Sequence, residues 1–179
     1  MENKISASKS GLQFGVFFGI IIILEFVIGY VINIDPSTNK AFGITINILN
    51  FLVLPLTFIY LGCTNFKKLN ANFISITESL KIGVSICILA AIISSIFSAL
   101  FNFFIPEYFD EIVKKAKMVM IRDNPQMTSE QMEMGISFMK KFANPAIAIP
   151  ATIVMYAFIG LIFSLIIGVI LKKDAYQSN

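Results

Sequence analysis

Long apolar runs limit the folds open to this chain more than any other feature of its sequence. Each run holds at least 20 residues, and a helix of that length, rising about 1.5 Å per residue, crosses the roughly 30 Å hydrocarbon core of a bilayer. Backbone groups in lipid must form their hydrogen bonds within their own segment, so each run is predicted to be a helix. The predicted spans are 11–32, 42–61, 80–104 and 146–171.

The composition supports a membrane protein. The chain is 56% hydrophobic and 14% charged, whereas soluble domains carry roughly 25% charged residues. We therefore predict one all-α membrane domain over residues 1–179, with four transmembrane helices in an up-down bundle. The first run is not expected to be a cleaved signal peptide, because it is too long and its small residues, Ser6 to Ser8, precede it.

The segment 105–144, between the third and fourth runs, has the pattern of two amphipathic helices. Pro106 suits a first helical position, and the stretch 123–125 (Asp-Asn-Pro) is a turn signal. Thr128 and Gln131 have the spacing of a capping box that opens the second helix. The apolar stripes are Phe109, Ile112, Val113, Ala116 and Met120, then Met132, Ile136, Met139 and Ala143. We predict an amphipathic helical hairpin that lies on the membrane surface or caps the bundle.

The distribution of basic residues predicts an orientation. With an even number of spans, both termini lie on one side of the membrane. The basic residues on that side, among them Lys67, Lys68, Lys172 and Lys173, lie in shorter segments and are therefore denser. By the positive-inside rule, both termini are predicted to be cytoplasmic.

Four stretches, in this order and spacing, carry a resemblance to a known family. They are SGLQFGVFFG, GCTNFKKLNANFISITESLKIG, FNFFIPEYFDEIVKKAK and NPAIAIPATIVMYAFIGLIFSLIIGVILKK. Over nearly its whole length the chain resembles the small four-span bacterial membrane proteins catalogued as a domain of unknown function. The resemblance implies the topology, and it implies no activity. The sequence departs from that pattern at residues 70–72, where relatives more often carry glycine in a tight turn.

Most kinds of catalytic or binding site lack their usual residues here. The sequence contains no histidine, the commonest general base and metal ligand, and we expect no enzyme activity. Cys63 and Cys87 fall in or beside spans on the cytoplasmic side of the predicted topology, so no disulfide is expected. Lys67 and Lys68 are too few to bind nucleic acid and are interpreted as lipid headgroup anchors.

Methionines in the segment 105–144 raise the question of a copper(I) site. Residues two apart on a helix point about 200° away from each other, so the two Met-x-Met pairs do not converge, and no metal or other cofactor is expected. The methionines are Met118, Met120, Met127, Met132, Met134 and Met139.

A glycine ladder in the first span predicts close helix packing. Gly11, Gly15 and Gly19 have overlapping GxxxG spacing, which lets two helix backbones approach closely in lipid. Packing within the bundle is the preferred interpretation, and a homo-oligomer is the alternative.

Glu25 is the one carboxylate within a predicted span, and the helical spacing places it on a face that packs against other helices. It lies roughly 10 Å from the outer end of its span, and Asn47 and Asn50 lie about 8 and 12 Å from theirs. Desolvation predicts a largely protonated Glu25 that is hydrogen-bonded to an asparagine; a proton or cation relay is the alternative. The predicted polar cluster is Glu25, Asn47, Asn50, Ser95, Ser98 and Tyr156, with Thr152 at a similar depth.

Taken together, these features predict an integral inner-membrane protein whose partner is the lipid bilayer. Its role is interpreted as structural or accessory, as a packing module of the envelope that binds itself or another membrane protein. The alternative is a small transporter or proton-coupled exchanger that uses Glu25.

Overall fold

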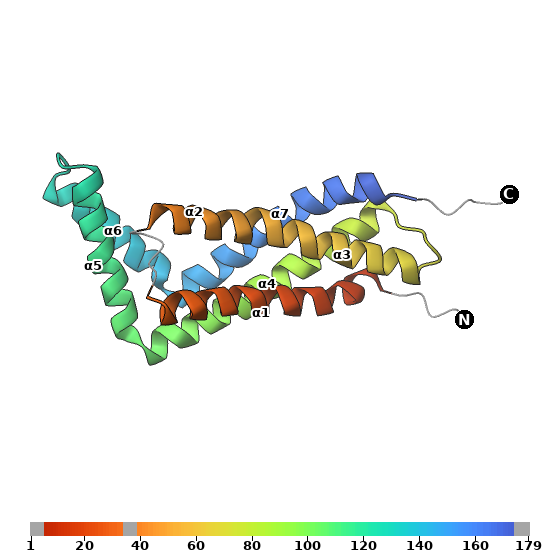
Figure 1. Cartoon of the computed structure of the whole chain (residues 1–179), viewed down its shortest axis with the longest axis horizontal. Helices are drawn as coiled ribbons and strands as arrows, with labels where there is room; N and C mark the ends of the chain where they lie inside the picture. Colours follow the sequence, from red (N-terminus) through yellow and green to blue (C-terminus); the bar gives the residue numbers. More distant parts are fainter. Residues whose placement is uncertain (1–5, 34–38, 174–179) are drawn as a thin grey trace.

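The computed structural model describes residues 6–33 and 39–173 of the chain, and they are almost entirely helical (Figure 1). The charged residues at positions 2, 4, 35 and 174 lie outside this part. The helices are α1 (Ala7–Val31), α2 (Lys40–Ile48), the π-helical turn η1 (Leu49–Val53), α3 (Leu54–Leu69), α4 (Ile76–Phe104), α5 (Pro106–Asp123), α6 (Ser129–Ala143) and α7 (Pro145–Leu171).

Four helices among the described residues are long and apolar enough to cross a membrane. They are α1, the continuous α2–η1–α3, α4 and α7, which correspond in order to the four predicted spans. The second is longer than predicted, since it runs over Lys40–Leu69 and so continues to the loop before α4. These helices confirm the prediction of an all-α, multi-pass membrane protein.

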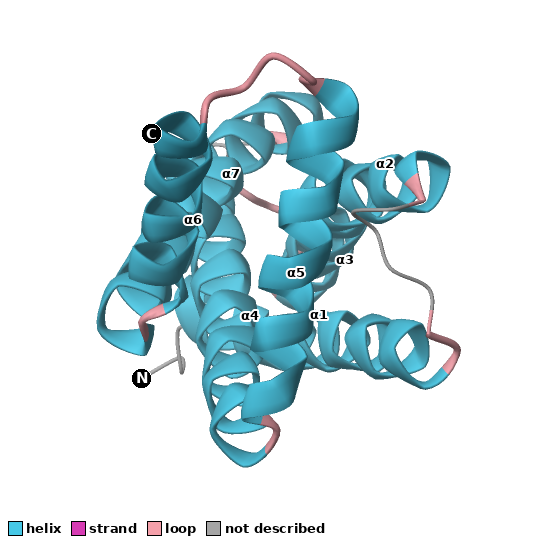
Figure 2. Ribbon diagram, turned by 90° about the vertical axis from the view of Figure 1, so that its left-hand side faces the viewer, coloured by secondary structure: helices cyan, strands magenta, loops and turns pink. Residues whose placement is uncertain are grey.

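The long helices lie alongside one another, and α4 packs against both α1 and α7 (Figure 1). The beginning of α1 and the end of α7 lie at one end of the bundle, which we call the terminal end. At the other end, called the α5/α6 end, α5 runs crosswise over the long helices (Figure 2). The two ends of the bundle therefore differ: α5 crosses one of them, and the beginning of α1 and the end of α7 lie at the other.

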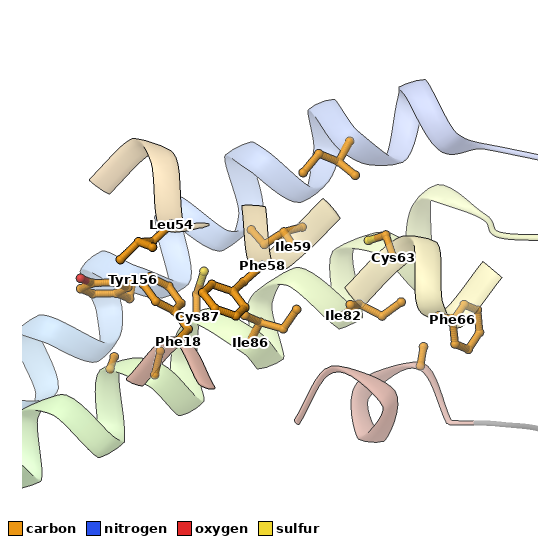
Figure 3. Packing of buried hydrophobic residues seen from close by; sticks show 14 of the residues in the cluster. Phe18, Leu54, Phe58, Ile59, Cys63, Phe66, Ile82, Ile86, Cys87 and Tyr156 are labelled. Carbon is orange, nitrogen blue, oxygen red and sulfur yellow. The ribbon is translucent and has the colours of Figure 1, made fainter. Parts of the chain in front are cut away.

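The hydrophobic core lies mainly in the half of the bundle nearer the terminal end. Its large buried side chains include Phe18, Phe58, Phe66, Ile82 and Ile86, from α1, α3 and α4 (Figure 3). Among the described residues, α2 contributes no side chain to this core and has no extensive packing against α1, α4 or α7. The bundle is therefore closed toward the terminal end and more open toward the α5/α6 end.

Close contact between α1 and α4 depends on the glycine ladder. A methyl group added at Gly15 would lie 2.9 Å from the backbone oxygen of Ile86, and one at Gly19 would lie 2.9 Å from the Cβ of Ile93. Gly11 faces the backbone of Ile82 in the same way. The ladder thus serves packing inside the chain, where small residues let helix backbones approach.

A tight turn joins α3 to α4 at the terminal end. Ala71 and Asn72 both have left-handed backbones, with φ of 51° and 64°, and the Phe73 amide donates to the Asn70 carbonyl at 2.9 Å. Positive φ at both central residues is typical of a type I′ turn, which glycine or asparagine adopts at lower cost than alanine. The turn that the resemblance implies is present even though this sequence lacks the glycine.

Lys67 joins the end of α3 to the end of α7. Its Nζ donates a hydrogen bond of 2.8 Å to the backbone oxygen of Leu171, one of the last carbonyls of α7. A cation at this position also interacts favourably with the negative end of the helix dipole. Ile74 and Lys173 form an antiparallel bridge beside it, so the terminal end is held by polar contacts as well as by the core.

The sequence explains where α5 and α6 begin. Pro106 is the first residue of α5, and Thr128 and Gln131 form the predicted capping box at the start of α6. The end of α5 is tied to the start of α2 by an ion pair of 3.2 Å between Lys40 Nζ and Asp123 Oδ2. This ion pair connects two elements that border the cavity described next.

Candidate solute pocket

The second long helix widens at the turn that carries Asn50. Leu49–Val53 form the π-helical turn η1, and Pro55 follows in the first turn of α3. Proline lacks a backbone N–H, and its ring clashes with the carbonyl four residues earlier, here that of Phe51. A π-turn removes this conflict locally, and such turns often occur at functional sites.

Glu25 of α1 and Asn50 of η1 are in contact. Both side chains are half-buried, and the Asn50 side chain is close enough to the Glu25 carboxyl group to interact with it. In the part of the chain that the structure describes, the buried side-chain polar atoms without a hydrogen-bond partner are Glu25 Oε2 and Asn50 Oδ1. Leaving such an atom unsatisfied costs about 1–3 kcal/mol, so both oxygens favour a hydrogen-bond donor.

These two residues line a half-enclosed cavity of about 420 Å³ at the α5/α6 end. This volume falls in the range of small-molecule sites, roughly 300–1,000 Å³. The lining comes from α1, α2, η1, α5 and the turn after α1: Ile22, Glu25, Phe26, Gly29, Tyr30, Asn33, Phe42, Ile46, Asn50, Tyr108, Glu111, Ile112 and Lys115. The cavity therefore combines apolar and aromatic walls with the polar side chains of Glu25, Asn33, Asn50, Glu111 and Lys115.

An aromatic cluster holds α5 beside the cavity. The ring of Tyr108, on α5, lies 5.6 Å from that of Phe26 and 5.5 Å from that of Tyr30, both on α1. Phe101 of α4 completes the cluster, 5.2 Å from Tyr108 and 4.8 Å from Phe26. Edge-to-face pairs of this kind are favourable beyond the area they bury, so α5 has a defined position as one wall.

The charged residues of the lining come from two helices. Glu25 lies on α1, whereas Glu111 and Lys115 lie one turn apart on α5. Lys115 already has an interaction partner. When Glu25 is ionised, the lining residues that the structure describes carry two carboxylates and one ammonium group, an excess of one negative charge.

A second aromatic layer closes the bundle on the terminal side of Glu25. Phe18, seven residues before Glu25 on α1, is fully buried and stacks on Phe58 of α3 with 5.5 Å between ring centres (Figure 3). The ring of Tyr156, on α7, lies 5.9 Å from that of Phe18. This layer separates the cavity from the terminal end.

A separate cavity of about 310 Å³ lies among α1, α4 and α7. Its lining includes Ser95, Ser98 and Tyr156 of the predicted cluster, together with Thr152. The Ser95 hydroxyl donates to its own helix, to the Ala91 carbonyl at 2.6 Å. The Ser95 hydroxyl donor therefore already has a hydrogen-bond partner on its own helix.

The predicted polar cluster is thus divided. The structure brings Glu25 and Asn50 together in one cavity, and it places Ser95, Ser98 and Tyr156 around the second cavity. Asn47 is exposed and lines neither cavity. An ideal α-helix would keep Asn47 and Asn50 close to one face, but η1 changes the helical register from Leu49 onward.

Sequence reasoning missed the residues that α5 contributes, Tyr108, Glu111 and Lys115. Tyr108 and Lys115 are half-buried within the predicted amphipathic helix, and their i, i+7 spacing puts them on one helical face. That spacing is the signal that could have found them. The crosswise direction of α5, which brings this face to α1, is a tertiary feature without a local signal.

The comparisons with known proteins identify a family. Residues 13–173 match the family described as Protein of unknown function (DUF4199), and the chain belongs to it. No curated protein and no solved structure matches the chain.

Proposed function

We propose that the protein is a small-solute exchanger of the membrane, in which Glu25 holds either a proton or the solute. One observation carries this proposal: buried, unpartnered oxygens of Glu25 and Asn50 line a cavity of solute size inside a bundle of membrane helices. An ionisable group within a membrane span is costly and usually marks a pathway for ions, protons or substrates. Neither ordinary helix packing nor lipid contact requires a carboxyl group here.

The proposal includes a topology. In it the spans alternate in direction as an up-down bundle in a bacterial inner membrane, with both termini cytoplasmic. The helices α5 and α6 then form an amphipathic hairpin at the outer surface, and the cavity faces outward. The protein binds lipid and solute but no nucleic acid, and it carries the solute without converting it, so it is not an enzyme.

Exchange requires the cavity to open alternately to the two sides. The layer formed by Phe18, Phe58 and Tyr156 closes the inner side in this state. Separation of α3 from α1 would open that layer, because Phe18 and Phe58 belong to these two helices. The weak packing of α2 supports a bundle that moves in parts, since few contacts oppose its displacement.

The test compares the intact chain with Gly29→Phe. Gly29 lines the cavity, so the added ring is expected to fill it while Glu25 remains. Both proteins are purified from native membranes in mild detergent, and the small molecules that accompany them are identified by mass spectrometry. The intact chain and the control Glu130→Gln, which alters an exposed carboxylate on α6, should carry a solute that Gly29→Phe lacks.

The intact chain in proteoliposomes should then accumulate that solute when the interior is acidic, because outward proton flow drives uptake. Identical sets of molecules on the intact chain and on Gly29→Phe would contradict solute binding. Uptake that does not depend on the pH gradient would contradict proton coupling.

A second candidate is a structural or accessory role in the envelope, and a stripe on α6 favours it. Met134, Phe138 and Phe142 follow one another at four-residue spacing and are 67%, 62% and 45% exposed. The rings of Phe138 and Phe142 lie 4.5 Å apart. A contiguous apolar stripe outside the core is typical of a surface that meets lipid or another membrane protein.

A photo-crosslinking residue at position 138 shows whether the α6 stripe meets lipid or another membrane protein. Crosslinks to one membrane protein, or to a second copy of the chain, would support the accessory role. Crosslinks to lipid alone would assign the stripe to the membrane surface and exclude this second candidate.

A further inference from the structure

Both unpartnered oxygens of the pocket are hydrogen-bond acceptors when Glu25 is ionised. Glu25 Oε2 belongs to a carboxylate, which only accepts, and Asn50 Oδ1 is an amide carbonyl. The Asn50 side chain already interacts with the Glu25 carboxyl group, and neither of these two oxygens has a donor. The group that satisfies the remaining atoms must therefore bring its own N–H or O–H donors.

Charge narrows the choice of donor. With Glu25 ionised, the described residues of the lining hold two carboxylates and one ammonium group, an excess of one negative charge. An ammonium group supplies a compensating positive charge and up to three N–H donors on one atom. Hydrogen bonds between ammonium and carboxylate are charge-assisted and stronger than those of a neutral alcohol or amide.

The walls of the cavity define the rest of the ligand. They are aromatic and aliphatic, with Phe26, Phe42, Ile46 and Ile112 among them. Such walls favour an apolar body, and aromatic rings also attract a nearby cation through their negative faces. Glu25 and Asn50 thus lie beside apolar walls, and Asn33, Glu111 and Lys115 add further polar side chains to the lining.

We propose that the pocket binds a monoamine with an apolar body, whose ammonium group donates hydrogen bonds to Glu25 and Asn50, in exchange for one proton. This inference rests on the proposed function, since it names the solute class of the same site. In the empty site, Glu25 is a neutral acid. When R–NH₃⁺ binds, the carboxyl O–H bond breaks, the proton leaves to water, and the carboxylate pairs with the ammonium. One positive charge enters as one leaves, so the charge of the site is unchanged.

Other titratable groups face the site and could in principle supply the proton. They are Tyr30 on α1, Tyr108, Glu111 and Lys115 on α5, and Tyr156 on α7. The lining residues from α2 and η1 are Phe42, Ile46 and Asn50, which do not titrate. The test must therefore show that the released proton comes from Glu25.

The experiment measures binding by calorimetry to the full chain in nanodiscs of phosphatidylethanolamine and phosphatidylglycerol. The probe is 2-phenylethylammonium, and three compounds with a similar body are compared with it: neutral 2-phenylethanol, anionic phenylacetate, and phenyltrimethylammonium, a cation without N–H donors. Nanodiscs that contain the Gly29→Phe variant give the background signal that arises when the probe compounds partition into lipid. The titration is repeated in buffers of different ionisation enthalpy, and the change in the observed binding enthalpy gives the number of protons released when the probe binds.

We expect 2-phenylethylammonium to bind above this background with release of about one proton, and the other three compounds to bind at least about tenfold more weakly. Glu25→Gln should weaken binding by at least about tenfold and abolish proton release. Glu111→Gln should keep proton release, and Glu130→Gln should behave as the unaltered chain. Asn50→Leu gives a second, independent variant: it removes the amide acceptor and should weaken amine binding even if Glu25→Gln fails to fold.

Three results would overturn the inference. They are equal or tighter binding of 2-phenylethanol or phenylacetate, amine binding without proton release, and proton release that persists in Glu25→Gln. If no probe binds above the Gly29→Phe background, the amine assignment fails. The proposed function then fails as well only if the intact chain also co-purifies with no solute that Gly29→Phe lacks.

Discussion

Gly15→Ala tests the packing of α1 on α4, which positions Glu25. The added methyl would lie 2.9 Å from the Ile86 backbone oxygen and 3.0 Å from the Leu89 Cβ. These atoms are backbone or near-backbone, so a rotamer change cannot relieve the overlap and the helices must separate. Overpacking of this kind costs about 1–3 kcal/mol, whereas replacing glycine by alanine in a helix gains up to about 1 kcal/mol.

Gly29→Ala is the matched control on the same helix. It makes the same chemical change where the glycine lines a cavity, so the gain in helix propensity remains and the overlap is absent. The difference between the two variants therefore isolates the packing cost, and we expect Gly15→Ala to be less stable than Gly29→Ala by about 1–3 kcal/mol. Reversible unfolding in mixed detergent and dodecyl sulfate measures both. Equal stabilities would refute the assignment of the glycine ladder to this interface.

Three further predictions concern the ends of the bundle. Ala71→Gly should stabilise the protein by about 1 kcal/mol in the same unfolding assay, since it relieves a left-handed alanine. The control Ala99→Gly, within α4, should destabilise the protein by a similar amount. A loss of stability in Ala71→Gly would contradict the type I′ turn. Lys67→Met should lower the free energy of unfolding by about 1–2 kcal/mol, because it removes the hydrogen bond to the Leu171 carbonyl. The control Lys68→Met, at an exposed position, should change the stability little. Equal effects of the two substitutions would contradict a stabilising role for the Lys67 hydrogen bond. The contacts of Asp123 with Arg122 and Lys40 lower the pKa of its carboxyl group. The ion pair with Lys40 therefore contributes to stability at pH values above the pKa that this carboxyl group has in the unfolded chain. That contribution is lost as the pH falls through the lower pKa of the folded protein. Protection of the first-turn amides of α2 against hydrogen exchange, taken relative to the intrinsic exchange rate at each pH, should fall over that range in the intact chain but not in Asp123→Asn. Identical protection profiles would exclude the link.

The sequence predicts the long helices well because their signal is local. An apolar run longer than the bilayer has few structural alternatives, and Pro106 and the Thr128–Gln131 capping box mark helix starts through neighbouring residues. The second helix extends past the predicted residue 61 because polar residues near a membrane surface do not end a helix. It ends at Leu69, before the turn in which Ala71 and Asn72 have positive φ.

The candidate site is only partly predictable because its geometry depends on register and on tertiary packing. Depth along the helices brings Glu25 and Asn50 to a similar level, but it cannot separate Asn50 from Asn47. That separation depends on η1, and Pro55 is its sequence signal. Ser95 lies at a suitable depth yet borders another cavity, because depth does not determine which helices are neighbours.

The central claim, that Glu25 exchanges a proton for an amine in the pocket, has a direct spectroscopic test. Infrared difference spectroscopy on the full chain in lipid follows the carbonyl stretch of a protonated carboxyl group, which disappears when that group ionises. Addition of 2-phenylethylammonium should remove one such band and produce carboxylate bands, and neither change should occur in Glu25→Gln. A protonated-carboxyl band that persists in the intact chain at saturating amine, or one that is lost equally in Glu25→Gln, would contradict the account.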